Sequence, residues 1–370
     1  IPYAIVPIVV RTFFDSRTAL FTHLVTVLIC SVIAPFPHEF LVMQVIAGMV
    51  VTYSLKELSQ RSQLMHCALF VFLSYALSYL GLVLYQDADI NKIHWTMFLY
   101  FGINFVLLMF TYVLVYILEK TFGYLSPITL VELSNINTGL LKKLSENCPG
   151  TFQHSLQVSI LASAAASEIG ANAQLARTGA MYHDIGKMSN PIYFTENQSG
   201  VNPHSSLSYE DSAKYIISHV TEGVKIAEKA SLPKEIIDFI RTHHGQGKAK
   251  YFYNSYRNKY PGKPIDESIF TYPGPNPFTK ETAIVMMADA VEAASRSLKE
   301  HTEEGISALV NKIIDGQIAD GLLKNAPLTF KDVETIKKVF IEKLKIIYHT
   351  RISYPDLKKA NADNKSPKQS

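Results

Sequence analysis

The residues that could do chemistry gather in the C-terminal half of the chain, around the run His183-Asp184-Ile185-Gly186-Lys187. Four more histidines and one late aspartate accompany this run: His154, His219, His243, His244 and Asp289. Imidazole and carboxylate side chains bind borderline divalent cations, and one carboxylate can bridge two of them. The pattern therefore predicts a hydrolytic site that holds two metal ions.

The alternative for each of these residues is a structural role in packing. A single histidine is more often a core residue than a ligand, and three are interpreted in that way: His38, His301 and His349. The adjacent pair His243-His244 together with the His-Asp pair is harder to explain by packing. Asp289 lies in an apolar context, where a cation or a salt bridge must compensate its charge. No cysteine joins the set, which disfavours a structural zinc site.

Asp184 is the natural bridging carboxylate of such a site, and Lys187 is the natural cation beside it. Two ions about 3.5–4 Å apart hold a hydroxide that is nucleophilic at neutral pH, and they neutralise a phosphate. Lys187 lies one helical turn from His183 and could place its ammonium over the scissile phosphate, the alternative being a solvated surface lysine. Mixed imidazole and carboxylate ligation suits two ions of iron or manganese, with magnesium, nickel or zinc as alternatives.

Helices, with almost no strand signal, are expected to position these residues. Apolar periodicity and helix-ending residues predict helices over 129–145, 152–169, 173–183, 209–230, 233–243, 279–299, 303–315 and 328–349. The stretches 190–208 and 245–278 are rich in Pro, Gly, Asn and Tyr and are expected to be irregular. Irregular segments of that length usually carry function.

The N-terminal third has a different composition from the rest. The chain is 48% apolar but only 18% charged, and the shortage of charge is concentrated in residues 1–118. Four apolar stretches, at 18–35, 38–55, 64–85 and 95–118, approach the ~20 residues that a membrane-spanning helix needs. Buried helices of a large soluble core are the alternative.

Loop charges predict how these spans are oriented. Basic residues precede the first span and separate the second from the third: Arg11, Arg17, Lys56 and Arg61. The alternate loops carry Asp87 and Asp89 with a single lysine, Lys92, so the basic side is expected to face the cytoplasm, together with everything after the fourth span. The net charge of +3 and the lack of a basic patch exclude a nucleic-acid polymer as partner.

Ordered motifs add a family resemblance to this interpretation. They are HDIGK at 183–187, PIYFTENQ at 191–198, NPH at 202–204, SAKYIISHV at 212–220, HHG at 243–245, YPGP at 272–275 and MMADAVEAASRS at 286–297. The pattern resembles the HD superfamily of metal-dependent phosphohydrolases. More narrowly, residues 1–350 resemble the seven-transmembrane HD phosphodiesterases that hydrolyse cyclic di-AMP in bacteria.

The resemblance implies two ligand sets and a reaction. One metal would be held by His154, His183, Asp184 and Asp289, and the other by Asp184, His219, His243 and His244. The implied reaction is cleavage of cyclic di-AMP to pApA. Because no Gly-Tyr-Pro follows His243-His244, the chain departs from the relatives that act on cyclic di-GMP. The alternatives are hydrolysis of cyclic di-GMP or another nucleotide, or a non-catalytic nucleotide-binding receptor.

Two further residues are expected to contact the nucleotide, Tyr272 and Arg296. The alternatives are a loop anchor for Tyr272 and a helix salt bridge for Arg296.

The expected fold is all-α, with polytopic transmembrane helices followed by a cytoplasmic all-helical HD domain. The expected divisions are a membrane region at 1–118, a helical connector at 119–150, the HD domain at 151–350 and a disordered tail at 351–370. The chain begins at Ile1, and relatives carry an extracellular domain and further spans, so a fragment is expected. The expected partners are a cyclic dinucleotide and the bilayer of a bacterial plasma membrane, and a homodimer is left open.

Overall fold

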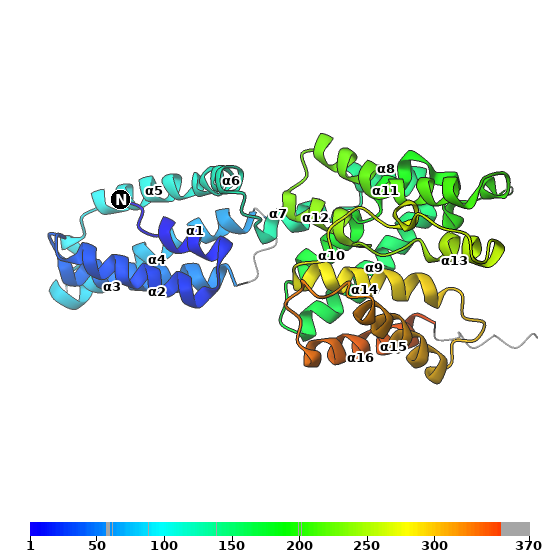
Figure 1. The fold of residues 1–370 in the computed structure, drawn as a ribbon. Helices are drawn as coiled ribbons and strands as arrows, with labels where there is room; N and C mark the ends of the chain where they lie inside the picture. Colours follow the sequence, from blue (N-terminus) through cyan, green and yellow to red (C-terminus); the bar gives the residue numbers. More distant parts are fainter. Residues whose placement is uncertain are drawn as a thin grey trace, which may run out of the picture.

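The computed structural model describes residues 1–56, 60, 62–87, 89–137, 139–198, 200 and 202–348. Over these residues the chain is helical, and the β structure is an isolated bridge between Lys248 and Thr271. This confirms the expected all-α class. The expected disordered tail at 351–370 and the loop residue Arg61 lie outside the described residues. Helices α1–α6 form one group and α8–α16 another, with α7 between them (Figure 1).

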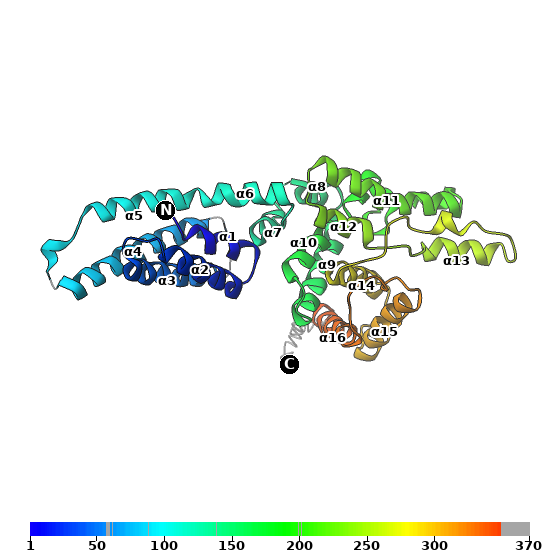
Figure 2. The same cartoon turned by 60° about the vertical axis from the view of Figure 1, so that its left-hand side comes forward.

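The first group contains the apolar stretches. Its helices are α1 (Ile5–Phe13), α2 (Ser16–Ser31), α3 (Pro37–Ser54), α4 (Ser62–Asp87), α5 (Thr96–Met109) and α6 (Thr111–Phe122). Among the described residues, two segments are long and apolar enough to cross a bilayer, Ser62–Gln86 and Thr96–Phe122, and the second of these joins α5 to α6. Figure 2 shows α5 continuing directly into α6. Ser16–Ser31 is a shorter apolar helix, and α3 opens with the polar residues His38 and Glu39.

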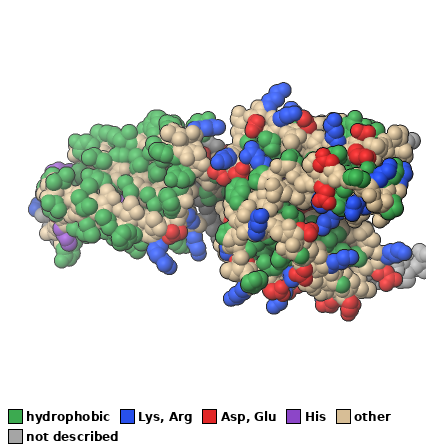
Figure 3. All heavy atoms as spheres, in the orientation of Figure 1, with side chains coloured by type: hydrophobic (Ala, Val, Ile, Leu, Met, Phe, Trp, Pro, Cys, Tyr) green, Lys and Arg blue, Asp and Glu red, His purple; other side chains and the backbone are tan. Residues whose placement is uncertain are grey.

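Large apolar side chains cover the outside of this group as well as its inside. Leu55, Tyr75 and Phe101 belong to its core, whereas Phe21 and Leu77 are about 70% exposed (69% and 70%). Figure 3 shows hydrophobic side chains over most of this surface and mixed charges over the second group. A surface this apolar matches hydrocarbon better than water.

The connector differs from the single helix expected over 129–145. The structure divides it into α7 (Pro127–Leu133) and α8 (Gly139–Asn147). The reason lies in Gly139, whose φ of +56° is left-handed and cannot continue a right-handed helix. Two side chains of the next domain bind the end of α7: the Tyr182 hydroxyl donates to the Leu133 carbonyl at 2.8 Å, and the Thr178 hydroxyl donates to the Leu130 carbonyl at 3.2 Å.

The second group is built around two long helices, α9 (Pro149–Glu168) and α14 (Lys280–Ser295). Around them lie α10 (Ala173–Tyr182), α11 (Tyr209–Lys229), α12 (Lys234–Thr242), α15 (Glu303–Ala319) and α16 (Phe330–Ile347). Leu161, Ile284 and Phe340 are fully buried where α9, α14 and α16 pack. Pro149 begins α9, because proline is well suited to the first turn of a helix.

The stretches expected to be irregular are more ordered than the sequence predicts. The first contains the short 3₁₀ turns Pro191–Tyr193, Thr195–Asn197 and Pro203–Ser206. The second contains α13 (Lys250–Lys259) and the turn Glu267–Phe270. The prediction missed α13 because its residues are mostly charged or aromatic and show no plain apolar stripe. Phe252 is its one buried residue and joins a small core with Val220 and Phe270.

Candidate metal centre

The seven predicted ligands come from five places in the fold. His154 lies in α9 and Asp289 in α14, the two central helices. His183 ends α10, and Asp184 follows it at the start of a 3₁₀ turn over Ile185–Ser189. His219 lies in α11, while His243 and His244 follow α12. All but His244 are buried, and the side chain of His244 is 28% exposed.

Four of these side chains form one cluster. The ligand atoms of His154, His183, Asp184 and Asp289 all lie within 4.8 Å of one another. His154 Nε2 is 2.9 Å from Asp289 Oδ1, and His183 Nε2 is 3.1 Å from Asp184 Oδ2. The set combines two imidazoles with two carboxylates around a common centre, which is the donor set expected for a divalent transition metal.

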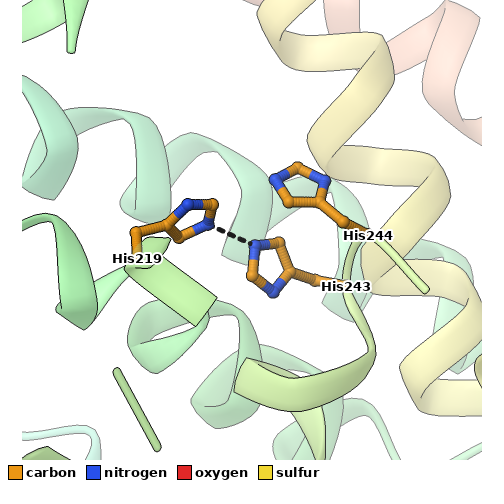
Figure 4. Close-up of side chains that lie close together, drawn as sticks. All are labelled: His219, His243 and His244. Atoms are coloured by element: carbon orange, nitrogen blue, oxygen red, sulfur yellow. Dashed lines mark hydrogen bonds between the residues drawn. The ribbon is translucent and has the colours of Figure 1, made fainter. Parts of the chain in front are cut away.

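Three histidines form a second cluster beside the first. The ligand atoms of His219, His243 and His244 also lie within 4.8 Å of one another. Figure 4 shows their rings converging, with His219 Nε2 and His243 Nε2 3.0 Å apart. Asp184 faces this cluster with its other oxygen, since Oδ1 lies 3.3 Å from His219 Nε2 and 3.7 Å from His243 Nε2. One carboxylate therefore presents one oxygen to each cluster.

Unsatisfied polar atoms show that these residues fit metal ions. His183 Nε2 and Asp184 Oδ1 are buried without a hydrogen-bond partner. A buried polar atom left unpaired costs about 1–3 kcal/mol. Cations between the clusters would satisfy both atoms and would separate the paired imidazole nitrogens of His219 and His243.

The electrostatics of the centre favour carboxylates in their ligand form. Burial alone would raise the pKa of Asp184, but His183 and Lys187 hold it well below its usual range. Burial likewise opposes ionisation of Asp289, yet the neighbouring imidazoles of His154 and His183 hold its pKa well below the usual range. Partial burial of the His244 ring lowers its pKa to about 3. Burial also disfavours charge on His183, but Asp184 and Asp289 raise its pKa to about 10, so metal binding there displaces a proton.

Lys187 is a buried ion-pair partner and not a solvated surface lysine. Its Nζ lies 2.8 Å from Asp184 Oδ2 and 2.7 Å from Glu196 Oε1, and its side chain is 13% exposed. Glu196 was not singled out from the sequence, although it lies within the motif at 191–198. The carboxylate also accepts a hydrogen bond from the Thr151 hydroxyl at 3.1 Å, which ties it to the first turn of α9.

A cavity of about 1100 Å³ opens beside the two clusters. Lys187, Glu196 and His244 line it, and so do the two predicted nucleotide contacts, Tyr272 and Arg296. Each also contacts a neighbouring side chain of the site. The Tyr272 ring lies 4.2 Å from that of His244, measured between centroids. The Arg296 guanidinium donates to Glu292 Oε1 from Nε at 2.8 Å and from Nη2 at 2.6 Å.

An all-helical domain with a buried His-Asp pair and further histidines around a common centre is the architecture of HD domains. Residues 151–294 match the family model described as HD domain. Residues 1–126 match the model described as 7TM receptor with intracellular HD hydrolase. The chain belongs to the family of HD-domain proteins.

Similar proteins include two curated bacterial relatives, both named Cyclic-di-AMP phosphodiesterase PgpH. The one from Bacillus subtilis is 36% identical over 97% of this chain and 52% of its own length. The one from Listeria monocytogenes is 43% identical over 64% of this chain and 33% of its own length. The chain thus spans about half or less of these relatives. The solved HD domain of the Listeria protein, in complex with cyclic-di-AMP, is 42% identical, with a TM-score of 0.55 over 58% of this chain and 99% of that one.

Proposed function

We propose that this chain is the catalytic part of a membrane-anchored, metal-dependent phosphodiesterase that hydrolyses cyclic di-AMP to pApA. The observation that carries the proposal is the position of Asp184, with one oxygen toward each of two ligand clusters at the edge of a cavity of about 1100 Å³. A cavity of that size accommodates a dinucleotide-sized ligand. The names of both relatives and the ligand of the solved Listeria domain support the substrate.

The metal ligands follow from the two clusters. One ion would take His154, His183, Asp184 and Asp289, and the other Asp184, His219, His243 and His244. When bound, such ions lower the pKa of a water molecule and neutralise charge on a phosphate. Iron or manganese is proposed because the donors are imidazoles and carboxylates without a thiolate.

The protein side chains around the cavity have separate tasks in this proposal. Lys187 holds a fixed positive charge beside Asp184, where it stabilises charge that develops on the reacting phosphate. Tyr272 and Arg296 lie along the same cavity and are proposed to contact the nucleotide. Lys248 and Lys312 also line it and add positive charge that suits a substrate with two phosphates.

The membrane assignment combines the family with the apolar surface. A multi-pass membrane region at 1–118, a connector at 119–150 and an HD domain at 151–350 are proposed, with the HD domain in the cytoplasm of a bacterial cell. The basic residues between the apolar stretches support this orientation. Fusing a reporter that is active on one side of the membrane after residue 348 tests it. The lipid bilayer is one proposed partner and a second copy of the chain is another, which light scattering in detergent measures.

Hydrolysis by the full 370-residue chain in detergent is the central experiment. The protein is loaded with Mn²⁺ or Fe²⁺, and cyclic di-AMP, cyclic di-GMP and a cyclic mononucleotide are supplied separately. The expected product is pApA, with slower turnover of the other substrates and none in Asp184→Asn. Metal-loaded protein that leaves cyclic di-AMP intact would reject the proposed reaction, and faster cleavage of cyclic di-GMP would reassign the substrate.

A further inference from the structure

His154 has an outer partner that distinguishes it from the other buried histidines of the centre. The Nδ1 atoms of His183, His219 and His243 each hydrogen bond to the backbone carbonyl three residues earlier, at 2.6, 2.6 and 2.8 Å. The Nδ1 atom of His154 instead lies 2.5 Å from Glu292 Oε2, across from α9 to α14. Among these four rings, His154 is the one oriented by a carboxylate.

Glu292 is itself held in place from its other side. Its Oε1 accepts both Arg296 hydrogen bonds, from one helical turn further along α14, while Oε2 faces His154. Glu292 is 3% exposed, and Asp289, one turn before it on the same helix, faces His154 Nε2 at 2.9 Å. Helix α14 therefore contacts both nitrogens of one imidazole, with residues three positions apart.

The position of the first cluster favours Nε2 as the nitrogen of His154 that would bind a metal. A proton on Nδ1 that is donated to Glu292 leaves the lone pair on Nε2, which lies among the other atoms of the first cluster. A carboxylate acceptor also raises the basicity of an imidazole more than a carbonyl does, and outer partners of this kind typically contribute about 10–100-fold to metal affinity or activity.

We infer that Glu292, anchored by Arg296, is a positioning residue that fixes the tautomer and orientation of His154 and thereby sets the affinity of the first metal position. The inference rests on the proposed metal centre but not on the identity of the substrate. It also gives Arg296 a task that does not require contact with a nucleotide.

The test measures metal binding in the absence of substrate. Mn²⁺ is titrated into the full metal-free chain in detergent, and the electron paramagnetic resonance signal of free Mn²⁺ reports the number of sites and their affinities. Glu292→Ala is expected to weaken one of two sites about 10–100-fold and to leave the other unchanged. The same site should be lost in His154→Ala and retained in His219→Ala.

Two further variants separate positioning from a general loss of structure. Glu292→Gln keeps an oxygen that can accept from His154 Nδ1, so it should recover part of the affinity that Glu292→Ala loses. Arg296→Met removes the anchor and should weaken the same site by a smaller factor. Glu342→Gln, an exposed carboxylate of α16, is the matched control and should bind as the unchanged protein does.

The outcomes distinguish this inference from the proposed function. Unchanged affinity at both sites in Glu292→Ala overturns the inference, whatever the hydrolysis assay gives. Equal weakening of both sites, with no recovery in Glu292→Gln, also overturns it, because the residue would then act on the fold and not on His154. Absence of cyclic di-AMP hydrolysis by a chain that binds two Mn²⁺ ions would reject the reaction and leave the role of Glu292 intact.

Discussion

Gly186 packs directly against the backbone of His219. A β-carbon at Gly186 would overlap the His219 carbonyl oxygen and also crowd the backbone of Gly223, one turn further along α11. The turn that carries Asp184 can approach α11 this closely only because residue 186 has no side chain. The contact brings Asp184 Oδ1 to 3.3 Å from His219 Nε2 and so joins the two clusters.

Replacing Gly186 by Ala should therefore push the two clusters apart. Overpacking of this kind typically lowers the free energy of unfolding by about 1–3 kcal/mol. Urea unfolding followed by circular dichroism measures that loss, and Mn²⁺ titration should show weaker binding at the histidine-rich site. Gly316→Ala is the control, because a β-carbon there meets no atom within 4 Å. In the last turn of α15 this change should stabilise the protein by up to about 1 kcal/mol. Similar stability in both variants would contradict the close approach.

The candidate ligands could be named from the sequence because their chemistry is carried by residue type. Three features are unusual in any fold: a His-Asp pair, two adjacent histidines, and an aspartate in an apolar helix. Glu196 and Glu292 could not be found in this way. Their importance comes from partners in other elements, Lys187 and His154, and glutamate is ordinary on a helix or in a loop.

The helices likewise divide into those that the sequence predicts and those that it does not. Helices with a clear apolar face, such as α11 and α12, could be predicted because their periodicity is local. The break between α7 and α8 depends on the left-handed backbone of Gly139, which the apolar spacing across it conceals. Helix α13 was missed because its stabilising contact is made by Phe252 in a core shared with α11 and the turn at Glu267–Phe270.

Asp184→Ala should abolish both hydrolysis and metal binding. The carboxylate presents an oxygen to each cluster, so its removal takes a ligand from both sites. The affinity for Mn²⁺ should fall by more than the roughly 10–100-fold that an outer partner contributes. Elemental analysis after dialysis and the pApA assay measure the two effects. Full metal content in this variant would refute the bridging role.

Lys187→Ala should separate turnover from metal binding. Its ammonium contacts Asp184 and Glu196 but supplies no lone pair to a cation. Hydrolysis should fall about 10²–10³-fold, as when one preorganised donor is removed from a charged transition state. Metal content should stay at the level of the unchanged protein. Metal loss equal to that of Asp184→Ala would show that Lys187 acts through the ligands and not on the phosphate.

Removing metal should destabilise the HD domain. Bound cations would satisfy the unpaired atoms His183 Nε2 and Asp184 Oδ1. They would also separate the close imidazole nitrogens of His219 and His243. A ligand present at 100 times its Kd stabilises the folded state by about 2.7 kcal/mol. Thermal unfolding followed by circular dichroism should shift downward with EDTA and recover with excess Mn²⁺. In Asp184→Ala the shift with EDTA should disappear, and an equal shift in that variant would assign the effect to chelation elsewhere.

The junction between the connector and the HD domain should depend in part on the Tyr182 hydroxyl. Tyr182, the residue before His183, donates to the Leu133 carbonyl at 2.8 Å and so binds the end of α7 to α10. Tyr182→Phe should lower the free energy of unfolding by about 1 kcal/mol, the usual net contribution of one such bond. Tyr251→Phe is the matched control, because Tyr251 is 75% exposed and its hydroxyl should contribute less than about 0.5 kcal/mol. Metal content should be the same in both, since neither hydroxyl touches a ligand. Equal unfolding midpoints for the two variants would mean that α7 is held to the domain by its apolar contacts, and that this hydrogen bond adds nothing.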